Sequence, residues 1–353
     1  MKEYLKKLRT RVIGGSFHEI NDRISELSIT NNKAKIEIEA LRAQNTELKK
    51  EFVDTIKEIE KLNRDFAQHR QDKNDDHWFL RNGFDRMIAK LQLAAIEQKV
   101  PGNQERLASL KDTHKGERCF IIGNGPSLTA ADLDVLHDNN VFTFASNRIG
   151  VIFPETLWRP NVWSVADILI FDNYREEGTN HKNSILLLSS EALLEQNILH
   201  DNAIYYPYIH IKRTPCSFSA DIMKGVHEFG TVTGQLINFA VYMGFSEIYL
   251  LGVDNMRPTK VNDSGRTIID TTRPWHFSKD YHINGAINTN TGHIIAEPLP
   301  DHEVFARSEI SAQTFKALDY YASKCGVKIY NATRGGALEV LERISFEKAL
   351  GIN

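Results

Sequence analysis

Ten residues decide the fold of this chain: Cys119-Phe120-Ile121-Ile122-Gly123-Asn124-Gly125-Pro126-Ser127-Leu128. The short apolar run breaks into Gly-Asn-Gly-Pro-Ser and then into helix-forming sequence, which predicts a buried strand, a glycine-rich turn and a helix N-terminus. Such a turn presents free backbone N–H groups and the positive end of a helix dipole, where phosphate binds. The stretch therefore predicts the floor of a nucleotide site. The alternative is that the two glycines are there for steric reasons alone.

The turn differs from two common phosphate-binding fingerprints. Leu128 stands where G-x-G-x-x-G has its third glycine, and no Gly-Lys-Ser/Thr follows to make a P-loop. The choice of nucleotide must therefore come from residues elsewhere in the chain.

The composition is that of an ordinary globular protein with room for two domains. The 353 residues are 41% hydrophobic and 25% charged, with a formal net charge of -3, so no nucleic-acid partner is expected. The sequence has no apolar run of about 18 residues and no secretory signal, which predicts a cytoplasmic protein. Cys119, Cys216 and Cys325 show no CxxC spacing, which favours a reducing compartment and argues against structural zinc or a disulfide framework.

The N-terminus, residues 1–15, is basic and amphipathic. Within residues 1–13, five lysines and arginines oppose the single acid Glu3, with apolar residues interleaved. A segment of this kind can lie on an anionic membrane, so peripheral contact with the inner face of the cell membrane is one interpretation. A solvated chain end is the other.

Residues 16–70 carry a heptad pattern. With Ile24 at position a, the a and d positions hold mostly apolar residues over roughly seven heptads, which predicts a coiled coil that makes the protein a homo-oligomer. Asn31 and Asn45 at a positions would fix the register of a parallel assembly at a cost in stability. The alternative is a helix packed on its own domain or a helical hairpin.

Residues 71–116 are expected to form a helical linker, and residues 117–353 an α/β domain. Strand and helix patterns alternate there, which predicts a mainly parallel, Rossmann-like sheet with helices on both faces and a lid loop at about 255–310. The predicted strands are 119–122, 141–146, 162–165, 184–188, 203–207, 246–254 and 327–330; the predicted helices are 131–136, 230–243, 313–325 and 337–341.

Ligands bind at the carboxyl ends of the strands in such a sheet. The polar and small residues expected there suit a nucleotide's phosphate, ribose and base, although each alone also fits turn or capping chemistry. They are Gly123, Asn124, Gly125, Ser127, Asn147, Arg148, Asp167, Thr233, Gly234, Asp254 and Asn331.

The lid supplies the candidate catalytic groups. A histidine can deprotonate a hydroxyl acceptor, and a tyrosine hydroxyl can donate to a departing phosphate. His276 is the first candidate for the base, with His302 and His282 as alternatives, and Tyr281 is the candidate donor. Metal ligands are present too, in Asp254, His276, Asp280 and His282, but Asp132-Leu133-Asp134 lies in a predicted helix rather than at a strand end. No essential metal is therefore expected.

Several of these segments resemble the family 42 bacterial sialyltransferases and the wider group that contains motility accessory factors and MptE-like 6-hydroxymethylpterin diphosphokinases. The similarity covers roughly residues 117–345. It rests on Ile-Ile-Gly-Asn-Gly-Pro-Ser-Leu (121–128), Phe-Ala-Ser-Asn-Arg (144–148), Thr-Val-Thr-Gly-Gln (231–235), Met-Gly-Phe-Ser-Glu-Ile-Tyr-Leu-Leu-Gly-Val-Asp (243–254) and Val-Lys-Ile-Tyr (327–330).

The resemblance implies an inverting, metal-independent glycosyltransferase with a CMP-activated, sialic-acid-like sugar as donor substrate and no other cofactor. Its acceptor would be a surface glycan or protein, as in polysaccharide biosynthesis. It implies that Asn124 and Asn147 contact the donor nucleotide, that Thr233 and Gly234 lie near the cytidine or sugar, and that a lid histidine is the base. Glu309 stands where the sialyltransferase pattern has its histidine. An ATP-dependent diphosphokinase and a catalytically inactive oligomeric scaffold are the alternatives.

Overall fold

The computed structural model divides the chain into two units, Met1–Gly83 and Phe84–Asn353. It describes residues 2–3, 22–23, 25–26, 28–40, 42–43, 76–165, 183–209, 218–256, 259–263, 265, 267–270, 273, 275–281 and 301–352, with backbone only at 76–82, 259, 267–269, 279 and 301–310. Asp167, His282 and Cys216 lie outside the described residues, as do most of residues 1–21 and 44–75.

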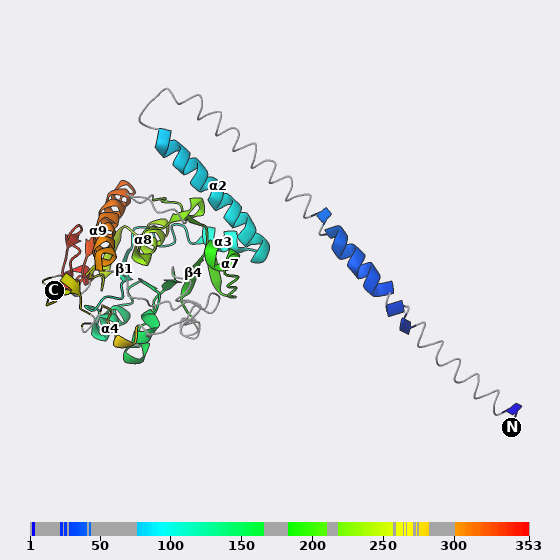
Figure 1. Ribbon diagram of the computed structural model, residues 1–353, viewed down its shortest axis with the longest axis horizontal. Helices are drawn as coiled ribbons and strands as arrows, with labels where there is room; N and C mark the ends of the chain where they lie inside the picture. The colour runs from blue at the N-terminus through cyan, green and yellow to red at the C-terminus, as the bar shows by residue number, and fades with distance from the viewer. Residues whose placement is uncertain are drawn as a thin grey trace. The chain divides into compact units, whose positions relative to one another are not determined.

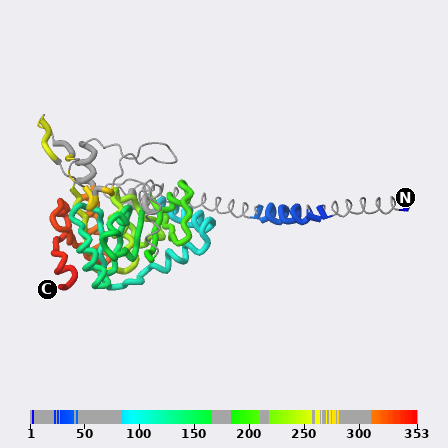
Figure 2. The backbone as a smooth tube through the Cα atoms, turned by 90° about the horizontal axis from the view of Figure 1, so that it is seen from below, coloured from blue at the N-terminus to red at the C-terminus, as the bar shows by residue number. Residues whose placement is uncertain are grey.

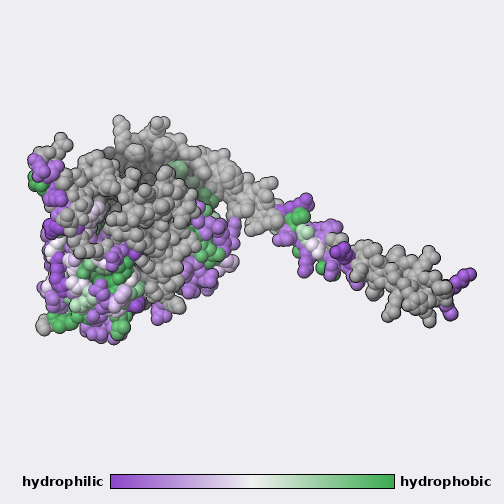
Figure 3. Space-filling view, turned by 60° about the horizontal axis from the view of Figure 1, so that its bottom comes forward, coloured by the Kyte–Doolittle hydropathy of each residue, from purple (hydrophilic) through white to green (hydrophobic). Residues whose placement is uncertain are grey.

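The described residues of the first unit are helical. Ile29, Ile36 and Ile38 are exposed on this helix, and Figure 3 shows such side chains as isolated hydrophobic positions on a mostly hydrophilic stretch. The coiled coil and the basic N-terminus stay predictions. No helix among the described residues is long and apolar enough to cross a membrane.

The second unit is built on a parallel sheet, as the sequence predicts. Its order within the described residues is β12-β11-β8-β1-β2-β3-β4-β5, and all neighbours are parallel. The strands are β1 (Arg118–Ile122), β2 (Thr143–Ser146), β3 (Val162–Val165), β4 (Ile185–Ser189), β5 (Ala203–Tyr206), β8 (Glu247–Leu251), β11 (Lys328–Asn331) and β12 (Glu342–Arg343). In the described part of the chain, two short pairs lie outside this sheet, β6 (Tyr208–Ile209) with β7 (Val226–His227) and β9 (Thr259–Val261) with β10 (Thr267–Ile269).

Both faces of the sheet are covered, because successive residues of the central strands β1 and β8 are apolar and point to opposite faces. Cys119 and Ile121 of β1 belong to one core cluster, whereas Phe120 and Ile122 belong to the other. Figure 1 shows α8 and α9 on one side of the strands and α4 on the other. The helical elements are α2 (Asp76–Lys99), α3 (Asn103–Ser109), α4 (Ala130–Asp138), η1 (Ile149–Glu155), α7 (Ser190–Leu194), η3 (Ile222–Lys224), α8 (Val232–Tyr242), η4 (Lys279–Tyr281), α9 (Asp301–Lys324) and α10 (Phe346–Leu350). The predicted α/β class is confirmed.

Residues 71–116, predicted as a helical linker, contribute to this unit from Phe84 onward. Leu93 and Leu107 are buried in one core cluster. The side chain of Asn103 both donates to the carbonyl oxygen of Tyr205 and accepts from its N–H, each at 2.8 Å. An amide side chain thus occupies backbone groups of the edge strand β5, so α3 covers an edge that could otherwise pair with another chain.

Two expectations near the C-terminus are wrong. The helix predicted at 337–341 is not formed; β12 and α10 follow instead. The N–H of Ala337 donates to the carbonyl of Asp254 at 2.8 Å, and Asn331 Nδ2 donates to the carbonyl of Leu338 at 2.8 Å, so this segment is held against the strand ends in a non-helical path. The lid is also shorter than predicted, because α9 begins at Asp301 rather than at 313. Figure 2 shows the β9–β10 hairpin, drawn in yellow, projecting from this unit.

Candidate functional site

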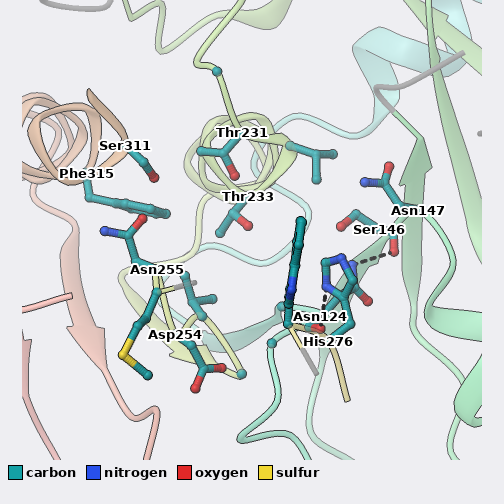
Figure 4. A pocket seen from close by; sticks show the side chains of 18 of the residues that line it. Asn124, Ser146, Asn147, Thr231, Thr233, Asp254, Asn255, His276, Ser311 and Phe315 are labelled. Atoms are coloured by element: carbon teal, nitrogen blue, oxygen red, sulfur yellow. Dashed lines mark hydrogen bonds between the residues drawn. The ribbon is translucent and has the colours of Figure 1, made fainter. Parts of the chain in front are cut away.

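A pocket of about 360 Å³ lies at the carboxyl ends of β1, β2 and β8. From β1 the chain proceeds through β2 to β5 on one side and later returns to β8 on the other, so this is the point where strand order reverses. Crevices at such points are the usual ligand sites of open α/β sheets. The lining comes from the turn after β1, the end of β2, the N-terminus of α8, residues 252–256, the lid segment 275–281 and α9 (Figure 4).

The two glycines after β1 are required by close packing against the end of β8. A Cβ on Gly123 would overlap the carbonyl oxygen of Gly252, and one on Gly125 would overlap the carboxylate of Asp254. The N–H groups of Gly123 and Gly125 donate to Leu251 and Gly252 carbonyls at 2.7 and 2.8 Å. These two N–H groups are therefore not free for phosphate, contrary to the expectation from sequence, although both glycines line the pocket.

Asp254 connects the end of β8 to the turn after β1. Its Oδ2 accepts from Ser127 Oγ at 2.8 Å, and the side chain is 5% exposed. Burial raises the pKa of the Asp254 carboxyl above its ordinary value, and hydrogen bonds from Ser127 oppose this. Ser127 lies behind the pocket lining and acts on it through Asp254.

This raised pKa predicts a pH-dependent difference between wild type and Asp254→Asn. A carboxyl group whose folded-state pKa is raised contributes stability below its unfolded pKa of about 4, and that contribution is lost as pH rises through the folded-state pKa. Relative to wild type, the Asn variant should therefore gain free energy of unfolding between pH 4 and pH 7 in urea titrations. Lost hydrogen bonding adds only a pH-independent offset. Exposed Asp138 on α4 supplies the control Asp138→Asn; an equal pH trend in both variants would contradict the assignment.

Asn124 and Asn147 bring unused hydrogen-bond acceptors to the pocket. Asn124 Nδ2 donates to the carbonyl of Ser146 at 3.2 Å, which fixes the orientation of its amide. Asn147 adopts a φ of 51°, and its carbonyl oxygen accepts from Trp163 Nε1 at 2.9 Å. Within the described part of the chain, the Oδ1 atoms of both asparagines are buried without a hydrogen-bond partner. A buried acceptor left unpaired costs about 1–3 kcal/mol, so these two atoms point to a ligand or water that carries N–H or O–H donors.

The N-terminus of α8 also points at the pocket. Thr231 is the N-cap residue but makes no side-chain capping bond to the described residues, and Thr231 and Thr233 both line the pocket (Figure 4). A helix N-terminus attracts anions through its dipole and its unpaired N–H groups. Gly234 lies behind the lining, where a Cβ would come within 2.6 Å of Phe229 Cβ. Its role in the structure is to let α8 pack closely.

The lid segment 275–281 contributes His276 and Tyr281. The carbonyl oxygen of Asn124 lies 3.1 Å from His276 Nδ1 and accepts from the N–H of Phe277 at 3.2 Å. Because a carbonyl can only accept, Nδ1 carries the proton, and in the neutral ring Nε2 is the basic nitrogen. Tyr281 is 4% exposed, and the centroid of its ring lies 3.9 Å from that of His276.

The structure places the remaining predicted residues as follows. Asn331 lies beneath the pocket, where its Oδ1 accepts from the N–H of Thr333 at 3.0 Å and its Nδ2 donates to Leu338. Arg148 is buried behind the lid. For His302 only the backbone, in α9, is described. Among the described residues, no group of three or more His, Cys, Asp or Glu side chains could hold a metal ion.

Sequence reasoning missed part of the lining. Asn255, Met256, Trp275, Ser311 and Phe315 also face the pocket, whereas Ser146 and Val253 belong to the strand ends that the sequence predicts. Asn255 adjoins the predicted strand-end residue Asp254, so its position follows from the strand boundary. Ser311 and Phe315 carry no local signal, because they reach the pocket only through the docking of α9.

Comparison with known proteins gives limited similarity. No protein-family model matches the chain, and no curated protein matches it. The solved structures that resemble it include a MAf glycosyltransferase from Magnetospirillum magneticum AMB-1, at 16% sequence identity with a TM-score of 0.40. The matched region covers 68% of this chain and 37% of the other.

Proposed function

We propose that this protein is a glycosyltransferase that transfers a sialic-acid-like sugar from a CMP-activated donor to a hydroxyl of a surface glycan or protein. The observation that supports it best is the pair of buried, unpaired amide oxygens of Asn124 and Asn147, in the same pocket as the N-terminus of α8. The amide oxygens can accept from the amino and hydroxyl groups of a nucleotide, and the helix N-terminus can bind the phosphate of that nucleotide.

His276 is the proposed base. In this mechanism, Nε2 takes the proton of the acceptor hydroxyl as that oxygen attacks the anomeric carbon of the donor. The bond between the anomeric carbon and the phosphate oxygen breaks, and CMP leaves with the electron pair. Attack from the face opposite the leaving group inverts the anomeric configuration. The helix N-terminus of α8 and the Tyr281 hydroxyl are the proposed groups that stabilise the departing phosphate.

Nucleotide binding distinguishes this proposal from its alternatives. We expect CMP to bind in calorimetry and raise the unfolding temperature, and the CMP-sugar to be hydrolysed slowly without acceptor. Binding of ATP with Mg²⁺ in place of CMP would support a diphosphokinase, and binding of neither nucleotide would support the oligomeric scaffold.

Replacing Asn147 by glycine tests the donor contact. Glycine adopts the positive φ without strain, so Asn147→Gly removes the amide and leaves the backbone as it is. The loss of one neutral hydrogen bond, about 0.5–1.5 kcal/mol, predicts a CMP affinity about 2–13-fold weaker. Asn140, which has a φ of 51° on the exposed surface after α4, provides the matched control Asn140→Gly. Equal CMP affinities in the two variants would contradict the contact.

Two further proposals concern the first unit. Residues 16–70 would make the protein a homo-oligomer, which light scattering of the full chain tests directly.

Residues 1–13 would bring it to an anionic membrane surface. Co-sedimentation would reveal this as a larger bound fraction with vesicles of anionic lipid than with vesicles of neutral lipid.

A further inference from the structure

Arg148 follows Asn147 at the end of β2, yet it faces the lid rather than the pocket. Its side chain is 5% exposed. Nη1 donates to the carbonyl oxygen of Asp280 at 2.8 Å and also to that of Tyr281. The guanidinium carbon lies 5.8 Å from the centroid of the Tyr281 ring. One buried cation thus binds two consecutive carbonyls at the end of η4.

These contacts bear on the candidate base through Tyr281. Its ring centroid is 3.9 Å from that of His276, so the position of one ring limits the position of the other. At the other end of the segment, Asn124 fixes His276 and Phe277 through its carbonyl oxygen. The segment 275–281 is therefore held at two points, by the end of β1 and by the end of β2.

We propose that Arg148 is a positioning residue, which holds Tyr281 against His276 and so keeps the His276 ring in place in the pocket. The guanidinium presents several N–H groups in a fixed plane and stays charged, which suits two adjacent carbonyls better than a lysine ammonium does. Its effect on catalysis rests on the proposed function, but its effect on the lid does not.

The lid effect is tested by hydrogen–deuterium exchange of the protein without nucleotide. In Arg148→Ala, the amides of 276–281 should exchange at least tenfold faster, and Arg148→Lys should show a smaller increase. Arg159→Ala is the matched control, because the Arg159 guanidinium also donates to two carbonyls, those of Thr156 and Trp158 at 3.0 and 2.7 Å, and lies over Phe153. Unchanged exchange in Arg148→Ala, or equal acceleration in the control, overturns the proposal.

The catalytic effect is tested by the turnover of a CMP-sugar. We expect kcat to fall 10–50-fold in Arg148→Ala with the CMP dissociation constant within threefold of wild type, an intermediate value for Arg148→Lys, and partial rescue of the Ala variant by added guanidinium. Urea unfolding of each variant verifies that it is folded. A loss of CMP affinity as large as the loss of kcat overturns the positioning role in catalysis. So does the absence of rescue by both the Lys substitution and added guanidinium. A wild-type protein that neither binds CMP nor turns over the donor rejects the proposed function, and the exchange experiment still decides the role of Arg148 in the lid.

Discussion

Replacing His276 by asparagine should lower the turnover of the CMP-sugar by about 10²–10⁴-fold, the range that a general base contributes. The asparagine amide can still donate to the Asn124 carbonyl in place of Nδ1–H, so the lid contact is kept while the basic nitrogen is lost. CMP affinity should therefore stay within a few-fold of wild type. Steady-state kinetics and calorimetry on the same preparation measure the two quantities.

Two further variants make the result specific. His276→Ala removes both the base and the contact with Asn124, so it should lose at least as much turnover and also loosen the lid. His137, exposed in the last turn of α4, provides the control His137→Ala, which should behave as wild type. Full turnover by His276→Asn would exclude His276 as the base and leave His282 and His302 as the candidates.

The location of the site could be predicted from the sequence because it depends on strand ends. The apolar runs that end at Ile122, Ser146 and Leu251 determine which residues reach the carboxyl edge of the sheet, and Asn124, Asn147 and Asp254 all line the pocket. Their order along the edge follows from the parallel pairing of β8, β1 and β2. The local hydrophobic pattern is sufficient to predict which residues lie at the carboxyl ends of the strands.

The use of each polar group could not be predicted, because it depends on contacts between segments far apart in sequence. Asn331 has the same residue type and strand-end position as Asn147, yet both ends of its amide are occupied by Thr333 and Leu338. The residue type of Arg148 does not distinguish between two roles, because an arginine at this position could bind either a nucleotide or the carbonyl oxygens of a lid. Only the position of Asp280 and Tyr281 decides between these two roles.

The turn after β1 shows the same limit. Its glycines have two candidate explanations from sequence, phosphate binding and steric need, and both predict Gly at 123 and 125. The structure adds that the end of β8 packs against the turn and accepts its N–H groups, which supports the steric explanation for these two residues. The N-terminus of α8, which begins at Val232, is therefore the element that we propose for anion binding.

Gly123→Ala should therefore be among the most destabilising single substitutions in the second unit. The added Cβ meets the carbonyl oxygen of Gly252 and lies 2.9 Å from Val253 Cγ2. Overpacking usually costs about 1–3 kcal/mol, and here the main obstacle is backbone at the end of a central strand, which no side-chain rotation can move. We expect a loss of at least about 3 kcal/mol in urea unfolding, at the upper end of that range, together with loss of CMP binding as β1 and β8 separate.

The comparison that isolates packing is Gly326→Ala. Gly326 has a φ of 78°, and no atom of the described residues lies within 4 Å of a Cβ placed there. Its substitution should cost only the conformational strain of a left-handed alanine, about 1–2 kcal/mol, and leave CMP affinity unchanged. If Gly123→Ala costs no more than Gly326→Ala while CMP affinity falls, then close packing against β8 is not why residue 123 is glycine. Approach of the nucleotide to the turn would then be the remaining reason, as the sequence first indicates.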